Sequence, residues 1–238
     1  MKINRVKYFN EIYPAIWKRQ NLENSVYDDD YCRNIVNLIC STNPKTVFEL
    51  AIGSGWPIAI KLKNLGIEVS GCDISNELIN QLKKNNRDIK TSVLGYDKLE
   101  TNKRYDVVYC VRSSWYFENI FEAIEKMLNI TRKQGEVIFD IMNASNNRIK
   151  LHIRKNYLNN INLVCKNLLR FVINIFINNK YQYAPLHPIE VPYQQREIEK
   201  FLDQRNLCYK KYSYNQITKV DEKFDDYSFR IIYVVSFH

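Results

Sequence analysis

Glycine, proline and histidine are scarce in this chain of 238 residues, which contains six glycines, six prolines and three histidines. This composition excludes collagen-like and low-complexity architectures, and a hydrophobic content of 45% argues against intrinsic disorder. The six cysteines form no CxxC pair and have no neighbouring histidine, which argues against a zinc site and against a disulfide framework. We therefore expect a globular protein with reduced thiols and no metal.

Long apolar runs are also missing. The most apolar stretch, residues 161–177, is interrupted by Lys166 and Arg170, so we expect no membrane span. The first residues, MKINRVKYFNEIYP, contain no apolar core of a signal peptide. These two features predict a cytoplasmic protein.

Acidic residues are absent from one long stretch. Residues 141–189 contain no Asp or Glu but seven Lys and Arg. The formal net charge of +9 divides into +2 for residues 1–143 (20 basic minus 18 acidic) and +7 for residues 144–238 (15 minus 8). The basic excess is therefore local, and it indicates an anionic small substrate or, as an alternative, an anionic membrane surface.

Strand and helix patterns alternate through the middle of the chain. Apolar runs predict strands at 46–52, 67–73, 89–94, 105–111 and 136–142, and amphipathic patterns predict helices at 56–64, 75–85 and 118–130. A further helix at 193–204 and two strands, at 209–218 and 229–237, close the chain. Such alternation predicts a doubly wound α/β fold whose site lies at the carboxyl ends of parallel strands.

A glycine pair and two acids mark the first two strand ends. Glu49 lies in the first predicted strand, and Gly53 and Gly55 follow it where the next helix begins. Glycines allow a tight turn that passes close to a ligand, and a helix N-terminus offers unpaired N–H groups. Asp73 ends the second strand, where a carboxylate is positioned to accept hydrogen bonds from ribose hydroxyls.

This segment resembles the class I S-adenosylmethionine-dependent methyltransferases. The matching features are Glu49 with its glycine pair, Asp73, the fourth-strand run Tyr105–Val108 and Gly135 before the fifth strand. The resemblance covers residues 45–143 well and the C-terminus by topology only. It implies a Rossmann-like, mostly parallel seven-stranded sheet with an antiparallel closing hairpin. Its cofactor would be S-adenosylmethionine, with S-adenosylhomocysteine as product.

The resemblance assigns cofactor roles to residues at four strand ends. Glu49 and the backbone from Ala51 through Gly53 to Gly55 would hold the methionine end of the cofactor, and Asp73 would bind its ribose. Ile74 would lie against the adenine, which Tyr96 or Asp97 would also face. Cys110 and Val111 would lie beneath the sulfonium. For Cys110, a buried strand cysteine without chemistry is the favoured interpretation.

Two positions depart from the family pattern, since Ala51 and Pro57 stand where its first and third glycines are expected. Ala51 is a small change, and a proline is tolerated in a first helical turn. A nicotinamide-dependent dehydrogenase is the competing Rossmann interpretation, but it would need the third glycine and different closing strands.

Three residues are candidates for acceptor binding and catalysis. Arg112 follows the fourth strand and could pair with a carboxylate or phosphate, while Tyr116 could stack on a flat or sugar acceptor. His187, held between two prolines, is the candidate general base if the acceptor is a hydroxyl. The plainer alternatives are aromatic packing and a loop-packing imidazole.

The chain divides into four expected parts: a helical N-terminal lid at 1–44, the Rossmann-like core at 45–143, a basic apolar cap insertion at 144–192, and the last helix and closing strands at 193–238. The apolar residues 161–178 predict a cap helix that is buried or forms a homodimer.

The leading hypothesis is methyl transfer to an O or N atom of a small polar acceptor, anionic or carbohydrate-like, such as a sugar or a nucleotide-linked sugar. DNA is not an expected partner, because the Asn-Pro-Pro-Tyr type of motif is absent. The alternatives are an RNA methyltransferase, which the basic stretch motivates, and a non-catalytic subunit that binds the cofactor.

Overall fold

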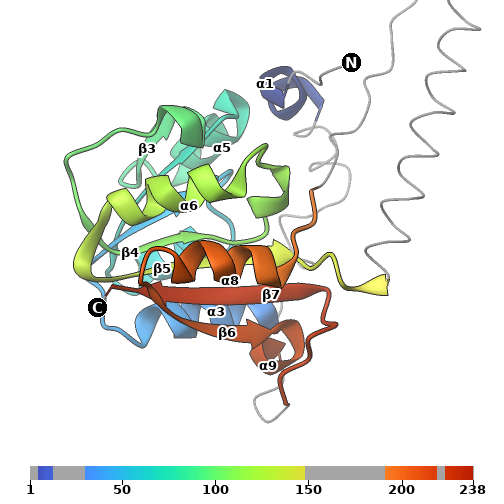
Figure 1. Cartoon of the computed structure of the whole chain (residues 1–238). Coiled ribbons are helices and arrows are strands. Elements are labelled where there is room, and N and C mark those ends of the chain that lie inside the picture. The colour runs from blue at the N-terminus through green and yellow to red at the C-terminus, as the bar shows by residue number, and fades with distance from the viewer. Residues whose placement is uncertain (1–4, 13–29, 148–190, 219–222, 238) are drawn as a thin grey trace, which may run out of the picture.

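The computed structural model describes residues 5–12, 30–147, 191–218 and 223–237. Its centre is a seven-stranded sheet with the order β3-β2-β1-β4-β5-β7-β6 (Figure 1). The strands are β1 (Thr46–Leu50), β2 (Glu68–Asp73), β3 (Lys90–Val93), β4 (Tyr105–Cys110), β5 (Thr131–Met142), β6 (Cys208–Ser213) and β7 (Arg230–Ser236). β1 to β5 pair in parallel, and β7 is antiparallel to both β5 and β6. The predicted seven-stranded sheet with an antiparallel closing hairpin is confirmed.

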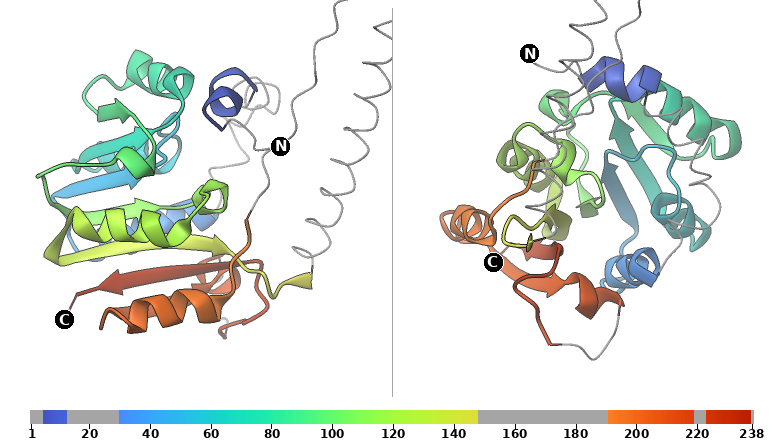
Figure 2. Two further views of the ribbon diagram at one scale, coloured as in Figure 1. Left: turned by 45° about the horizontal axis from the view of Figure 1, so that its top comes forward. Right: turned by 90° about the vertical axis from the view of Figure 1, so that its right-hand side faces the viewer.

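Helices cover both faces of the sheet (Figures 1 and 2). They are α3 (Asp30–Cys40), α4 (Ile58–Asn64), α5 (Asn76–Asn85), α6 (Ile120–Asn129), α8 (Gln195–Asp203) and α9 (Tyr214–Thr218). The core on one face joins the strands to α6 and α8, and the core on the other joins them to α3, α4, α5 and α9. Neighbouring β1 residues divide between the two cores, with Val47 in one and Phe48 in the other, as the pleat of a strand buried on both faces requires.

The helix boundaries follow from their caps. The Ser75 hydroxyl accepts a hydrogen bond from the backbone N–H of Leu78 and begins α5, as the sequence predicts. Asn119 begins α6 in the same way, because its side chain accepts from the backbone N–H groups of Phe121 and Glu122. Both helices therefore begin just after loops at the carboxyl edge of the sheet.

Two strand boundaries differ from the prediction. β5 begins at Thr131, so Gly135 lies inside the strand rather than before it. A Cβ atom at Gly135 would come within 2.5 Å of the carbonyl oxygen of Asp106, which explains the glycine. The predicted strand at 209–218 is wrong in its second half, because Tyr214–Thr218 forms the short helix α9.

The N-terminal segment reaches the carboxyl edge of the sheet. α1 (Arg5–Lys7) and a π-helical turn at Tyr8–Ile12 lie beyond the ends of the parallel strands (Figure 2). The Ser75 hydroxyl donates to the carbonyl oxygen of Phe9 at 2.7 Å, and Asn10 Oδ1 accepts from the backbone N–H of Asn76 at 2.8 Å. These contacts fix the N-terminal turn against the start of α5. The division into a lid and a cap stays a prediction, since residues 148–190 lie outside the described part.

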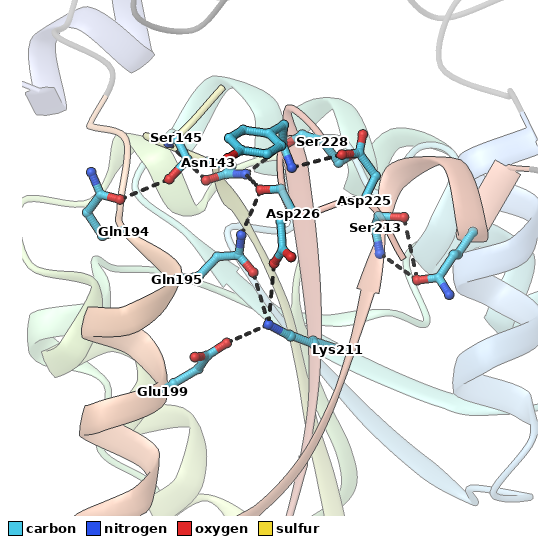
Figure 3. A network of polar contacts seen from close by, with 12 residues as sticks. Asn143, Ser145, Gln194, Gln195, Glu199, Lys211, Ser213, Asp225, Asp226 and Ser228 are labelled. Atoms are coloured by element: carbon cyan, nitrogen blue, oxygen red, sulfur yellow. Dashed lines mark hydrogen bonds and ion pairs between the residues drawn. The ribbon is translucent and has the colours of Figure 1, made fainter. Parts of the chain in front are cut away.

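A polar network joins the loop before β7 to the end of β5 (Figure 3). Asn143 Nδ2 donates to the carbonyl oxygens of Asp226 and Ser228, both at 2.8 Å. Lys211 Nζ donates to Glu199 Oε1 at 2.9 Å and lies 3.8 Å from Asp226 Oδ1. The network fixes the chain just before β7 begins, and with it the place where the first side chain of β7 lies.

Candidate functional site

A cavity of about 530 Å³ lies at the carboxyl edge of the sheet. Its walls come from the ends of β1, β2 and β4, the loops that follow them, the N-terminal segment and the first residue of β7. This volume is typical of sites for small molecules and cofactors. The cavity is where a doubly wound sheet is expected to bind its ligand.

The turn after β1 forms the floor of the cavity. Its backbone has positive φ angles at Ala51 (64°), Gly53 (56°) and Gly55 (76°). Of the turn residues predicted to hold the methionine end of the cofactor, Ala51 and Gly53 line the cavity, and Gly55 is not among its lining residues. A Cβ atom at Gly55 would lie 2.7 Å from Leu82 Cδ1, so this glycine lets α5 approach the turn. The three left-handed residues reverse the chain within one tight loop.

Ala51 is the strained member of this turn, because left-handed backbone costs an alanine roughly 1–2 kcal/mol. We expect Ala51→Gly to stabilise the protein by about 0.5–1 kcal/mol, since part of that gain is offset by the greater entropy of unfolded glycine. Thermal unfolding checks this, with Ala59→Gly inside α4 as the control. The control should lose about 1 kcal/mol. A melting temperature lowered by Ala51→Gly would disprove strain at this position.

Asp73 ends β2 and faces the same turn. Its Oδ2 accepts from the backbone N–H of Gly53 at 2.8 Å, and its Oδ1 accepts from the N–H of Ser75 at 2.7 Å. The residue is only 8% exposed and lines the cavity. Burial raises the pKa of Asp73 to about 6, against the lowering effect of these N–H groups. A carboxylate has about four acceptor positions, so each oxygen retains capacity for a ligand hydroxyl.

Glu49 is the second buried acid of the cavity wall. Its Oε2 accepts a hydrogen bond from the Tyr109 hydroxyl at 2.9 Å. Burial raises the pKa of Glu49 to about 8, partly opposed by this hydrogen bond and reinforced by the charge of Asp73. A positively charged ligand would favour the ionised form of Glu49.

The residues predicted to face an adenine lie together along one wall. Ile74, Tyr96 and Asp97 all line the cavity. The Tyr96 ring packs against Phe117, with 4.9 Å between ring centroids, and its hydroxyl accepts from the backbone N–H of Asn119 at 3.2 Å. Tyr96 is thereby fixed between the third-strand exit and the start of α6.

The loop after β4 forms another part of the wall. Val111, predicted to lie beneath the sulfonium, and the acceptor-site candidates Arg112 and Tyr116 all line the cavity. Cys110 is not among the lining residues and is fully buried in the core, in agreement with the interpretation as a structural cysteine. Arg112 has a φ of 62°, and its backbone N–H donates to Asp140 Oδ1 at 2.9 Å. A left-handed arginine held by a buried carboxylate is typical of a functional site.

Sequence reasoning missed the group behind this wall. Asp140, fully buried in β5, accepts from the Tyr31 hydroxyl at 2.8 Å through Oδ2. Arg230 Nη1 lies 3.7 Å from the same oxygen, and the Arg230 guanidinium lies 4.5 Å from the Trp115 ring centroid. Arg230 and Trp115 line the cavity. The available signal was an acid within the apolar run 137–142 and a base at the start of the apolar run 230–235.

His187, the predicted general base, lies outside the described residues, so its place in the site is still a prediction. Among the residues that the structure describes, no three His, Cys, Asp or Glu side chains are grouped as a metal site would require. Within the same ranges, no helix is long and apolar enough to cross a membrane.

The chain is similar in sequence to one family model and in fold to several solved structures. Residues 48–139 match the family model described as a methyltransferase domain. Solved structures with a similar fold include an S-adenosylmethionine-dependent methyltransferase from Clostridium acetobutylicum ATCC 824, with 15% identity, a TM-score of 0.63 and coverage of 94% of this chain and 97% of that one.

Two further structures resemble nearly the whole chain. Magnesium protoporphyrin IX methyltransferase from Synechocystis PCC 6803, with bound S-adenosylhomocysteine, has 12% identity, a TM-score of 0.63 and 98% coverage of both chains. The plantazolicin methyltransferase BpumL, in complex with a pentazolic desmethylPZN analog and S-adenosylhomocysteine, has 13% identity, a TM-score of 0.64 and coverage of 98% of this chain and 95% of that one. Among curated proteins, no sequence is similar enough to match this chain.

Proposed function

We propose that this chain is an S-adenosylmethionine-dependent methyltransferase that methylates an O or N atom of a small, polar, anionic acceptor. The methyltransferase-domain match over residues 48–139 and the fold that the chain shares with solved S-adenosylmethionine-dependent methyltransferases support this proposal. The observation that carries this proposal is one continuous cavity with two chemically different sides. One side presents the buried acids Glu49 and Asp73, and the other presents Arg112, Arg230 and aromatic rings.

The acidic side fits the cofactor. Asp73 offers acceptor positions for two ribose hydroxyls beside the tight turn at Gly53. Glu49 is a buried carboxyl whose ionised form a positive ligand would favour. Ile74 and Tyr96 would flank the adenine ring. Bound there, S-adenosylmethionine would supply a methyl group on a positively charged sulfur, and neutral S-adenosylhomocysteine would be the leaving group.

The aromatic side fits the acceptor. The Tyr116 ring lies 5.4 Å from that of Phe9 and 5.8 Å from that of Trp115, so three rings from two distant segments form one wall. Such a wall would hold a flat ring or a sugar face, and the arginines of this side, Arg112 and Arg230, would supply the positive charge for its anionic group. Holding two reactants in line is the main contribution a protein can make to this reaction, worth up to about 7–11 kcal/mol of the barrier.

Incubation of the purified protein with methyl-labelled S-adenosylmethionine and a fractionated cell extract tests the proposal. We expect label in a low-molecular-weight fraction retained on an anion exchanger, and no label with Asp73→Ala. The exposed Asp203→Ala variant is the control and should label normally. Label confined to RNA would overturn the proposal in favour of an RNA methyltransferase. Cofactor binding with no labelled product would indicate the non-catalytic subunit.

A further inference from the structure

The residues that the structure describes compensate the positive charge of Arg230 only in part. Its Nη1 is buried and has no hydrogen-bond partner among the described residues, and the nearest carboxylate oxygen, Asp140 Oδ2, is 3.7 Å away. That oxygen already accepts from the Tyr31 hydroxyl at 2.8 Å. A buried charge that receives no hydrogen bond at Nη1 is only weakly compensated, so an anion bound at the part of the Arg230 side chain that lines the cavity would be stabilised by this guanidinium.

The charge balance behind the cavity wall favours an anion. One carboxylate, Asp140, faces two guanidinium groups, because the charges of both Arg230 and Arg112 act on it and lower its pKa against the raising effect of burial. Asp140 therefore divides its charge between the two arginines, and an anion at the cavity face of Arg230 would add to the compensation that Asp140 supplies at 3.7 Å.

The fold fixes where Arg230 lies. β7 runs antiparallel to β5, with Arg230 opposite Met142, so the first residue of β7 lies where the parallel strands end. The guanidinium is held against the Trp115 ring at 4.5 Å, and its side chain is 17% exposed toward the cavity that it lines. Cation–π contact and the polar network before β7 together orient the group.

From this geometry we infer that Arg230 is the specificity-determining residue of the acceptor site: its guanidinium receives a carboxylate or phosphate group carried by a flat acceptor that stacks on the aromatic wall. This inference rests on the proposed methyltransferase function and names the group that would select the acceptor. Asp140 acts as a positioning residue, because it holds Tyr31, the Arg112 backbone and Arg230 around one buried carboxylate. Neutral analogues of the acceptor would leave the cavity side of the guanidinium without an anionic partner.

Binding of small aromatic probes to the protein saturated with S-adenosylhomocysteine tests this inference by calorimetry. Benzoate and phenyl phosphate each carry one oxyanion on a ring, and benzyl alcohol is the neutral counterpart. We expect at least one anion to bind roughly 10- to 100-fold more tightly than benzyl alcohol. Comparison of the two anions identifies whether a carboxylate or a phosphate is preferred.

Two variants and one control locate the effect. Arg230→Gln should abolish the preference for the anion, and Arg230→Lys should retain part of it, since lysine retains the charge but not the planar fork. Arg205→Gln is the matched control, because Arg205 also pairs with a carboxylate, Glu125, and stacks on a ring, Phe201, but does not line the cavity. It should bind the probes as the unaltered protein does.

The outcomes distinguish a failure of the inference about Arg230 from a failure of the proposed methyltransferase function. Equal binding of anion and alcohol, no binding of either anion, or an unchanged preference in Arg230→Gln would each overturn the inference about Arg230. Binding of S-adenosylhomocysteine to all variants shows that they fold and that the cofactor side is intact. If the unaltered protein does not bind S-adenosylhomocysteine, the proposed function itself fails.

Discussion

Replacing Asp73 by alanine is expected to weaken the binding of S-adenosylhomocysteine by about 100-fold or more. Asp73 would lose hydrogen bonds from two ribose hydroxyls, and hydrogen bonds to a charged acceptor contribute about 1.5–3 kcal/mol each. The variant also loses the acceptor for the backbone N–H groups of Gly53 and Ser75, so the turn that borders the ligand would be less well held. Isothermal titration calorimetry measures the loss directly.

Two further variants, Asp73→Asn and Asp203→Ala, show whether the loss of affinity in Asp73→Ala comes from the missing carboxylate. Asparagine retains one oxygen acceptor, so its affinity should lie between those of the unaltered protein and Asp73→Ala. Asp203, exposed at the end of α8, should be replaceable without effect on the cofactor. Normal S-adenosylhomocysteine affinity in Asp73→Ala would show that the ribose lies elsewhere and would remove the basis of the whole cofactor assignment.

The pH dependence of cofactor selectivity is the second large effect, and it arises from Glu49. The pKa of Glu49 is about 8 in the protein without ligand, so the carboxyl is mostly protonated near neutral pH. S-adenosylmethionine carries a positive sulfur that S-adenosylhomocysteine lacks, and this charge favours the ionised carboxylate. We expect the affinity ratio of S-adenosylmethionine to S-adenosylhomocysteine to rise by up to about tenfold per pH unit from about pH 6 to about pH 8, then to level off.

Glu49→Gln is the control for this titration. Its affinity ratio should not change with pH, because glutamine does not ionise in this range. The unliganded proteins offer an independent check of the sign. A folded-state pKa above the ordinary value means that Glu49 costs stability as pH rises from about 4.5 to about 8, by up to about 1.4 kcal/mol per unit. The melting temperature of Glu49→Gln should therefore exceed that of the unaltered protein at high pH only. Parallel pH profiles of the two proteins would contradict a buried titrating Glu49.

The order of the sheet could be predicted because its strands are buried on both faces. Such strands read as continuous apolar runs, as around Val47 and Val108, and their alternation with helices leaves few topologies. The extent of β5 and the helix α9 were harder to predict. Gly135 and Tyr214 adopt their conformations because of contacts with residues distant in the sequence, which local patterns do not record.

The two sides of the site also differ in how far the sequence alone predicts them. The acidic side follows from a local motif, since Glu49, Gly53 and Asp73 lie on two neighbouring strands linked by one helix. Arg230 reaches the cavity only because the last strand returns antiparallel beside β5. Its partner Asp140 is far away in sequence, so neither residue alone indicates a charged wall. The role of His187 stays a prediction.

The most direct test of the central claim is a crystal structure of the protein with S-adenosylhomocysteine. We predict both ribose hydroxyls within hydrogen-bond distance of the Asp73 carboxylate, the adenine between Ile74 and Tyr96, and the sulfur directed toward Arg112 and Tyr116. The space beyond the sulfur should then be bounded by Trp115 and Arg230. A ligand bound outside this cavity, or one whose sulfur faces away from the arginine wall, would contradict the assignment of the two sides.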